Sequence, residues 1–262
     1  MSAQAPIDLD SSVAITDPSL KNSHNQNRID RVILAFGNMT AWLFPVLVIA
    51  ICLQVILRKS GHNQAWLDDA QWWIYGFIVT LAFSYAILTE SHVRVDVLYQ
   101  GFSRNRQIRT EIFGLGWLLL PFLILMSDVM FQYGWTSFSA GEGSSSPNGL
   151  HHLYILKLSL PVLFAIAALA CGSMAYRNLR VIAQGHLYQM LIAIFPAAVF
   201  FAQRVITYGL WWVLQLLNPD VSGARIYKLP IMAHTEVYAF VLVVVITLAS
   251  WIKTTAIQKS EV

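Results

Sequence analysis

The sequence predicts an all-α integral membrane protein with six transmembrane helices. Of its 262 residues, 56% are hydrophobic and only 12% are charged, whereas about 25% of residues are charged in a typical soluble domain. Six apolar segments are long enough to cross a bilayer, which takes about 20 helical residues. The net charge of +3 is small. Because the basic residues gather in particular loops, they do not indicate a nucleic-acid-binding protein.

The first 27 residues are polar and precede the first apolar segment. Pro6 and Pro18 stand there among Ser, Asn, Asp and Gln. The segment lacks the basic start and adjoining apolar stretch of a signal peptide. We expect residues 1–27 to form a disordered cytosolic tail.

Apolar composition places the six spans at about residues 31–57, 66–89, 112–137, 153–176, 187–217 and 231–251. Pro45 in the first span and Pro121 in the third are possible kinks, which membrane helices tolerate. Asp68 and Asp69 open the second span, followed by Gln71, Trp72 and Trp73, and carboxylates suit the positive N-terminal end of a helix. Cys52 and Cys171 lie in apolar segments and are expected to be small buried residues.

The distribution of Lys and Arg predicts the orientation, because short cytosolic loops are enriched in these residues. With the N-terminus inside, eleven basic residues lie on the inner side and four on the outer side. We therefore expect both termini in the cytosol. The inner set is Lys21, Arg28, Arg31, Arg94, Arg104, Arg106, Arg109, Arg177, Arg180, Lys253 and Lys259, and the outer set is Arg58, Lys59, Arg225 and Lys228.

A polar stretch separates the second and third spans and is predicted to be a cytosolic loop. It reads E-S-H-V-R-V-D-V-L-Y over residues 90–99 and continues into Arg104, Arg106 and Arg109. We expect His92, Arg94 and Asp96 to fix the cytosolic end of the second helix through charge-assisted hydrogen bonds. Glu90, Tyr99 and Arg104 are further structural or interface candidates in the same stretch.

Two charged residues fall well inside predicted spans, Asp128 in the third and Arg204 in the fifth. A charge within the membrane is costly and usually faces protein or water. The folded assembly should therefore supply Arg204 with an acceptor. Asp128 and Glu236 are the candidates within the chain, and a partner subunit is the alternative.

The remaining polar residues form no pattern typical of catalysis, and we expect no enzyme activity, cofactor or metal site. The histidines lie in loops or at helix ends, whereas a bis-histidine membrane cytochrome needs axial ligands inside its helices. A membrane anchor for a haem or quinone redox enzyme is the alternative function. It would need histidine or methionine within the spans, and Met39, Met126, Met130 and Met174 are present there, although such methionines more often serve packing. A channel would need rings of charge or a carbonyl filter. The loop pair His151–His152 is more often solvated than metal-bound.

Several motifs follow one another in an order and spacing that resemble a known family. Over residues 30–182 they resemble the small permease, a DctQ-like Q subunit, of tripartite ATP-independent periplasmic (TRAP) transporters. The outer loop looks like that of the mannitol/chloroaromatic subgroup. The motifs are V-I-L-R at residues 55–58, W-L-D-D-A-Q-W at 66–72, H-V-R-V-D-V-L-Y at 92–99 and G-E-G-S-S-S-P-N-G-L at 141–150, together with Pro121, Trp135, Lys157 and Pro161.

The resemblance implies a four-helix core over residues 28–182 and a C-terminal extension, residues 183–262, that adds two helices. It implies a small subunit in the bacterial inner membrane that braces a large M-type permease. A periplasmic binding protein would deliver an organic acid such as a dicarboxylate, and an ion gradient, commonly sodium, would drive uptake. Asp69, Trp72 and Lys157 would have structural or interface roles. The loop facing the binding protein would include Glu142, Ser146, Pro147, Asn148, Gly149 and Leu150.

The fourth span carries a set of small residues that would allow close helix approach. We expect this set to pack against the large permease. Other faces of the chain would contact membrane lipid. Its members are Ala165, Ala167, Ala168, Gly172 and Ser173.

Overall fold

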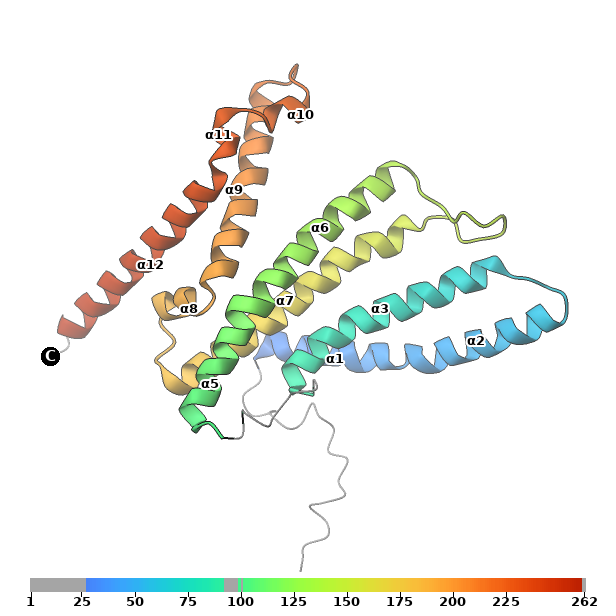
Figure 1. Cartoon of the computed structure of the whole chain (residues 1–262), viewed down its shortest axis with the longest axis horizontal. Coiled ribbons are helices and arrows are strands. Elements are labelled where there is room, and N and C mark those ends of the chain that lie inside the picture. The colour runs from blue at the N-terminus through green and yellow to red at the C-terminus, as the bar shows by residue number, and fades with distance from the viewer. Residues whose placement is uncertain (1–26, 92–98, 100, 261–262) are drawn as a thin grey trace, which may run out of the picture.

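The computed structural model describes residues 27–91, 99 and 101–260 of the chain. Within these ranges it contains helices and no strand, and six helical segments are long and apolar enough to cross a membrane. The predicted all-α membrane fold with six spans is thereby confirmed. In Figure 1 the spans form three antiparallel pairs, and the pairs spread apart from one another toward the loops that join the two members of each pair.

The first pair consists of a bent helix and a straight one. The bent helix is divided into α1 (Arg28–Ala41) and α2 (Leu43–Lys59), and α3 (Ala65–Thr89) runs back beside both. The chain turns at Trp42 because Pro45 has no N–H to donate and its ring clashes with the carbonyl four residues earlier. The interruption thus falls three residues before Pro45, where the sequence allowed for a kink.

The third span is longer than the sequence predicted. It comprises α5 (Arg104–Phe113), the π-helix η3 (Gly114–Leu119) and α6 (Leu120–Ser139). The helix begins at Arg104, so basic residues that we expected in a loop lie on its first turns. The wide π-helical turn ends at Leu119, two residues before Pro121, whose missing N–H and ring would strain an ordinary α-helical turn.

The fourth span, α7 (Tyr154–Ile182), lies at the centre of the core. It contacts α1, α3, α5 and α6. Buried side chains from α1, α3, α6, α7 and α9 form one cluster, and they are Ile33, Leu34, Ile87, Leu88, Leu120, Leu123, Ala167, Ala170, Cys171, Met174 and Ala197.

Two expectations about buried small residues were wrong in part. Ala167 is completely buried within this chain, so the small residues of α7 do not form one face open to a partner. Ala167 serves internal packing, where its small side chain lets neighbouring helices approach, whereas Ala165 is exposed. Cys171 is buried as expected, but Cys52 is exposed on α2.

The fifth span begins later than predicted. Residues 187–217 are divided into the short helix α8 (Leu187–Ala193) and the spanning helix α9 (Phe195–Leu217). The break falls at Ile194, two residues before Pro196, which starts α9 because proline suits the first turn of a helix.

The last span, α12 (Thr235–Ser260), is also displaced from its predicted position at about 231–251. Two single-turn helices, α10 (Gly223–Ile226) and α11 (Pro230–Ala233), connect it to α9. Pro230 starts α11, and the chain turns again at His234 before α12 begins.

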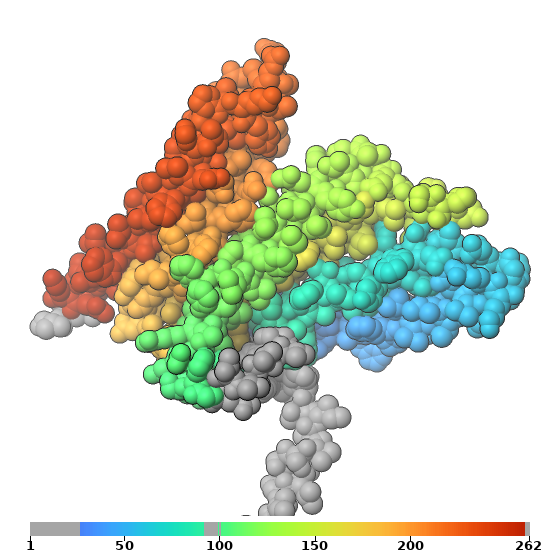
Figure 2. Space-filling view, viewed as in Figure 1, coloured from blue at the N-terminus to red at the C-terminus, as the bar shows by residue number. Residues whose placement is uncertain are grey.

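The α8–α12 segment docks on the core through a close backbone contact at Gly116 of η3. A Cβ at this position would lie 2.1 Å from the carbonyl oxygen of Ala193, so only glycine fits. Beside it, Trp117 donates its indole N–H to the carbonyl of Ile192 at 3.3 Å. Figure 2 shows that α9 touches the core along part of its length and that a notch opens between α9 and the far end of α6.

Candidate functional site

Polar side chains at three levels of the bundle hold the helices together and include most of the described residues that the sequence singled out. One group joins α2, α3 and the 140–153 loop at the predicted outer end. A second joins α6 and α9 inside the membrane. A third lies at the predicted inner end, near α1, α5 and α7.

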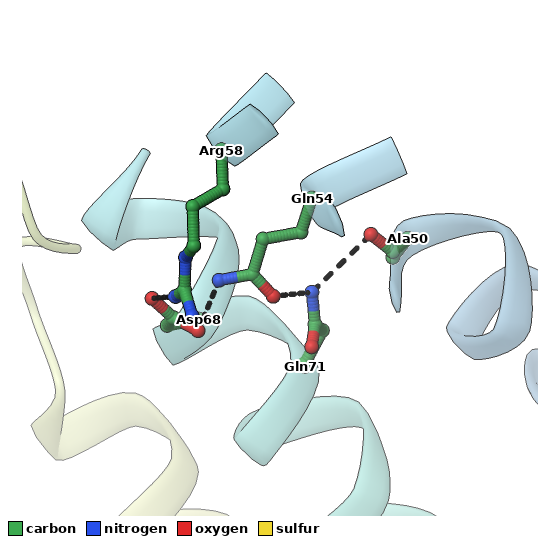
Figure 3. Close-up of polar contacts among 5 residues, drawn as sticks. All are labelled: Ala50, Gln54, Arg58, Asp68 and Gln71. Atoms are coloured by element: carbon green, nitrogen blue, oxygen red, sulfur yellow. Dashed lines mark hydrogen bonds and ion pairs between the residues drawn. The ribbon is translucent and has the colours of Figure 1, made fainter. Parts of the chain in front are cut away.

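In the first group, a chain of hydrogen bonds joins α2 to α3 (Figure 3). Asp68 accepts a hydrogen bond from the Gln54 amide and contacts the Arg58 guanidinium at 3.4 Å. Gln71 donates to Gln54 Oε1 at 2.6 Å and to the carbonyl of Ala50 at 3.2 Å. Asp68 therefore does not only interact with the positive N-terminal end of α3. It also accepts hydrogen bonds from polar side chains of α2, which lie in an apolar span.

Asp69 points to the other side of α3 and holds the outer loop. Its Oδ2 accepts the backbone N–H of Leu150 at 2.9 Å. Gly149 is buried against this carboxylate, and a Cβ there would lie 2.7 Å from Asp69 Oδ2 and 2.1 Å from Ser144 Oγ. The loop closes on itself where Ser144 donates its backbone N–H to the carbonyl of Leu150 at 3.0 Å.

The base of the same loop is held by an ion pair. Lys157 donates to Glu142 Oε2 at 2.6 Å, Ser137 donates to the same oxygen at 2.5 Å, and the ammonium lies 4.3 Å from the Tyr133 ring centroid. These hydrogen bonds from Lys157 and Ser137 lower the pKa of Glu142 below its ordinary value. Of the loop residues predicted to face a binding protein, Ser146, Pro147 and Asn148 are exposed, whereas Gly149 is buried and Glu142 is engaged in this contact.

The pKa of Glu142 is lowered in the folded protein. The Glu142–Lys157 ion pair is therefore fully formed above the ordinary pKa of glutamate, about 4.3, and weakens as the pH falls through the lowered value. We expect a spin label at Ser145→Cys to become more mobile as the pH falls through this lowered pKa. In Glu142→Gln the label should already be mobile at pH 7, with little pH dependence. An unchanged spectrum in that variant would show that Asp69 holds the loop without Glu142.

The second group lies inside the membrane and joins α6 to α9. Asp128 Oδ1 accepts a hydrogen bond from Tyr208 at 2.6 Å, and Asp128 Oδ2 lies 3.1 Å from Arg204 Nε. The Arg204 guanidinium also lies 5.2 Å from the Phe200 ring centroid. Of the two carboxylates considered as partners of Arg204, Asp128 is thus the one in contact. This contact joins the third span to the fifth.

The third group contains an ion pair that the sequence analysis missed. Asp30 is completely buried, and its Oδ2 accepts a hydrogen bond from Arg177 Nη1 at 3.1 Å and from the backbone N–H of Asn27 at 3.2 Å. Both residues stand near the ends of predicted spans, where we counted Arg177 only as a topological charge. The signal available was Asp30 itself, an acidic residue between Arg28 and Arg31 that caps α1.

An open cleft of about 710 Å³ lies beside this ion pair and brings together predicted residues from three segments. Glu90, Tyr99 and Arg104 line it with Arg177. Glu111 accepts hydrogen bonds from the Tyr99 hydroxyl and, at 3.1 Å, from the Asn178 amide. The predicted contacts of His92, Arg94 and Asp96 lie outside the described residues.

Trp72 does not join any of these groups. Its side chain is 70% exposed on α3 and meets Tyr75 edge to face, with ring centroids 6.2 Å apart. This position is consistent with an aromatic anchor at the membrane interface. Over the same described ranges, no group of three His, Cys, Asp or Glu residues could hold a metal ion.

Comparison with protein families gives one match that covers about half of the chain. The family model described as "Tripartite ATP-independent periplasmic transporters, DctQ component" matches residues 47–181. This range begins in α2 and ends in α7, so it contains the outer loop, Asp128 and Lys157, whereas Arg204 and the α8–α12 segment lie beyond it. No curated protein and no solved structure matches the chain.

Proposed function

Because this chain belongs to the DctQ family, the small membrane components of TRAP transporters, we propose that it braces the large permease of such a transporter rather than conducting solute itself. The family is one of transporter components and not of enzymes, and the chain is a multi-pass membrane protein. The observation that carries the bracing role is that the charges deepest in the described spans are engaged within the chain, as Asp128 and Arg204 are.

The arrangement of polar groups supports a static subunit. Asp68 and Gln54 join two helices, Asp128 and Arg204 join two others, and Asp30 and Arg177 join α1 to α7. A transporter's own solute site is typically built at mid-membrane from broken helices whose free backbone groups face a cavity. Here the polar groups serve helix packing.

The proposal extends to partners and setting. The partners would be a large M-type permease and a periplasmic binding protein, in a bacterial inner membrane with both termini in the cytosol. The solute would be an organic acid such as a dicarboxylate, taken up with sodium. The exposed loop tip at Ser146–Asn148 would face the binding protein. Labelling of a cysteine at Ser145 from outside intact cells, but not of one at Ser103, tests the orientation.

Two finer assignments have different support. The mannitol/chloroaromatic subgroup rests on the outer-loop motif at residues 141–150 together with Pro121, Trp135, Lys157 and Pro161, and the family match does not extend to it. The alternative of an anchor for a haem or quinone enzyme is not supported, since the family that matches is a transporter component. An absorption spectrum of the purified protein with a haem Soret band would reopen that alternative.

We expect tagged protein to copurify with the large permease in mild detergent. Reconstituted uptake should require this chain, the permease and the binding protein together. Vesicles that contain this chain alone should accumulate no solute above the level of empty vesicles. Solute accumulation by this chain alone would contradict the bracing role.

A further inference from the structure

The polar group at mid-membrane is incomplete within this chain. Arg204 Nε and Asp128 Oδ2 are buried and 3.1 Å apart, yet neither atom forms an aligned hydrogen bond. A third of the Arg204 side chain is exposed. The guanidinium contacts Asp128 and lies over the Phe200 ring, and Tyr208, which donates its hydroxyl to the same Asp128, is a further neighbour. An arginine side chain has five N–H donors, so further acceptors are needed in a medium without water.

The depth of Arg204 limits what can supply these acceptors. At about 1.5 Å per residue, roughly 20 Å of helix separate it from the Leu217 end of α9 and roughly 14 Å from the Phe195 end. The hydrocarbon core of a bilayer is about 30 Å thick. Lipid phosphates and ester groups lie at its two surfaces, far from this guanidinium. A protein group is therefore the favoured acceptor.

A line of exposed residues on α9 runs directly past Arg204, and we call it the α9 stripe. Its members recur at the three- and four-residue spacings that place side chains on one helix face. The large side chains of the stripe are each more than half exposed. The α9 stripe consists of Phe201, Val205, Gly209, Trp212 and Leu216.

Gly209 lies in the middle of the α9 stripe without an internal reason for being glycine. It lies inside α9, and a Cβ added there would meet no described atom within 4 Å apart from its own helix backbone. Glycine inside a helix costs about 0.5–1 kcal/mol relative to alanine. In membranes a small residue on an open face lets a second helix approach closely. The notch between α9 and α6 in Figure 2 leaves room beside this face.

We propose that a transmembrane helix of the large permease packs along the α9 stripe and supplies an acceptor, a carboxylate or a free carbonyl, to Arg204. This inference rests on the proposed function, which provides the partner. A second copy of this chain fits less well, because its own α9 stripe is apolar and offers no acceptor. A symmetric contact of two stripes would also bring two Arg204 side chains together.

The first test fills the space at Gly209. Gly209→Leu should leave the melting temperature of the isolated chain unchanged or slightly raised, because its new side chain meets open space. It should lower the amount of permease retained in mild detergent at least tenfold. Gly76→Leu is the matched control on α3, where a Cβ also meets no atom within 4 Å, and it should retain the permease. Full retention by Gly209→Leu, or equal loss from both variants, would overturn the inference.

The second test identifies the neighbour. A photoreactive residue at Val205 should crosslink to the permease, whereas one at Leu248, an exposed position of α12, should not. If the permease copurifies but Val205 crosslinks to a second copy of this chain or only to lipid, the α9 stripe is not the permease site although the proposed function stands. If no permease copurifies with the unmodified protein, the proposed function itself fails.

Discussion

Asp128→Leu is expected to destabilise the protein by about 3 kcal/mol, because it leaves Arg204 unpaired at mid-membrane. Removing one partner of a buried ion pair costs about 3–5 kcal/mol. We expect the lower end here, since Arg204 is one-third exposed. The same change also removes the acceptor of the Tyr208 hydroxyl. Unfolding in mixed detergent, followed by circular dichroism, would measure the loss.

The double variant Asp128→Leu/Arg204→Leu tests whether the loss of stability comes from leaving one buried charge unpaired. Replacing both charges by apolar side chains often restores stability, because no charge is left unsatisfied. We expect the double variant to lie within about 1 kcal/mol of the unmodified chain. Tyr208→Phe is the mild control and should cost about 1 kcal/mol for one hydrogen bond. A double variant as unstable as Asp128→Leu would show that these side chains act through packing and not through charge.

Gly116→Ala is expected to weaken the docking of the α8–α12 segment, with a cost of about 1–3 kcal/mol. Its new methyl group would lie 2.1 Å from the Ala193 carbonyl oxygen, and this oxygen belongs to backbone, so it cannot move alone. Amide hydrogen exchange should accelerate in α8 and in the first turns of α9, while exchange in α3 and α7 stays slow.

Gly114→Ala is the matched control on the same π-helix. A Cβ at position 114 meets no atom within 4 Å. There the gain in helix propensity is expected to dominate, so this variant should be stabilised by up to about 1 kcal/mol. Equal behaviour of the two glycine variants would show that the contact with Ala193 does not limit the docking of the segment.

The family match ends at residue 181, and the structure shows how the remaining segment is attached. The attachment uses a glycine contact, a tryptophan hydrogen bond to Ile192 and the Asp128–Arg204 pair. The domain boundary at about residue 183 stays a prediction. Asp128 lies in the matched range, and its partner Arg204 lies beyond that range.

The sequence alone determined the class and number of the spanning elements, because apolar composition over about 20 residues is a local property. It also drew attention to Pro45, which lies three residues after the helix interruption at Trp42, since proline acts on its own helix. It located Asp69, Asp128 and Arg204 as unusual positions, because each is a charged residue in or at the end of an apolar segment, where its cost is visible without a fold. Lys157 was indicated only by the resemblance to a known family.

Only the tertiary structure decided which of these residues meet. Asp69 contacts Leu150, Asp30 contacts Arg177 and Asp128 contacts Arg204, and each pair is separated by more than seventy residues of sequence. The same holds for Ala167, which packs inside the chain rather than on an open face. Spacing along one helix gives the face a residue occupies but not which helix covers that face. That choice follows from close contacts such as Gly116 against Ala193, which depend on the whole bundle.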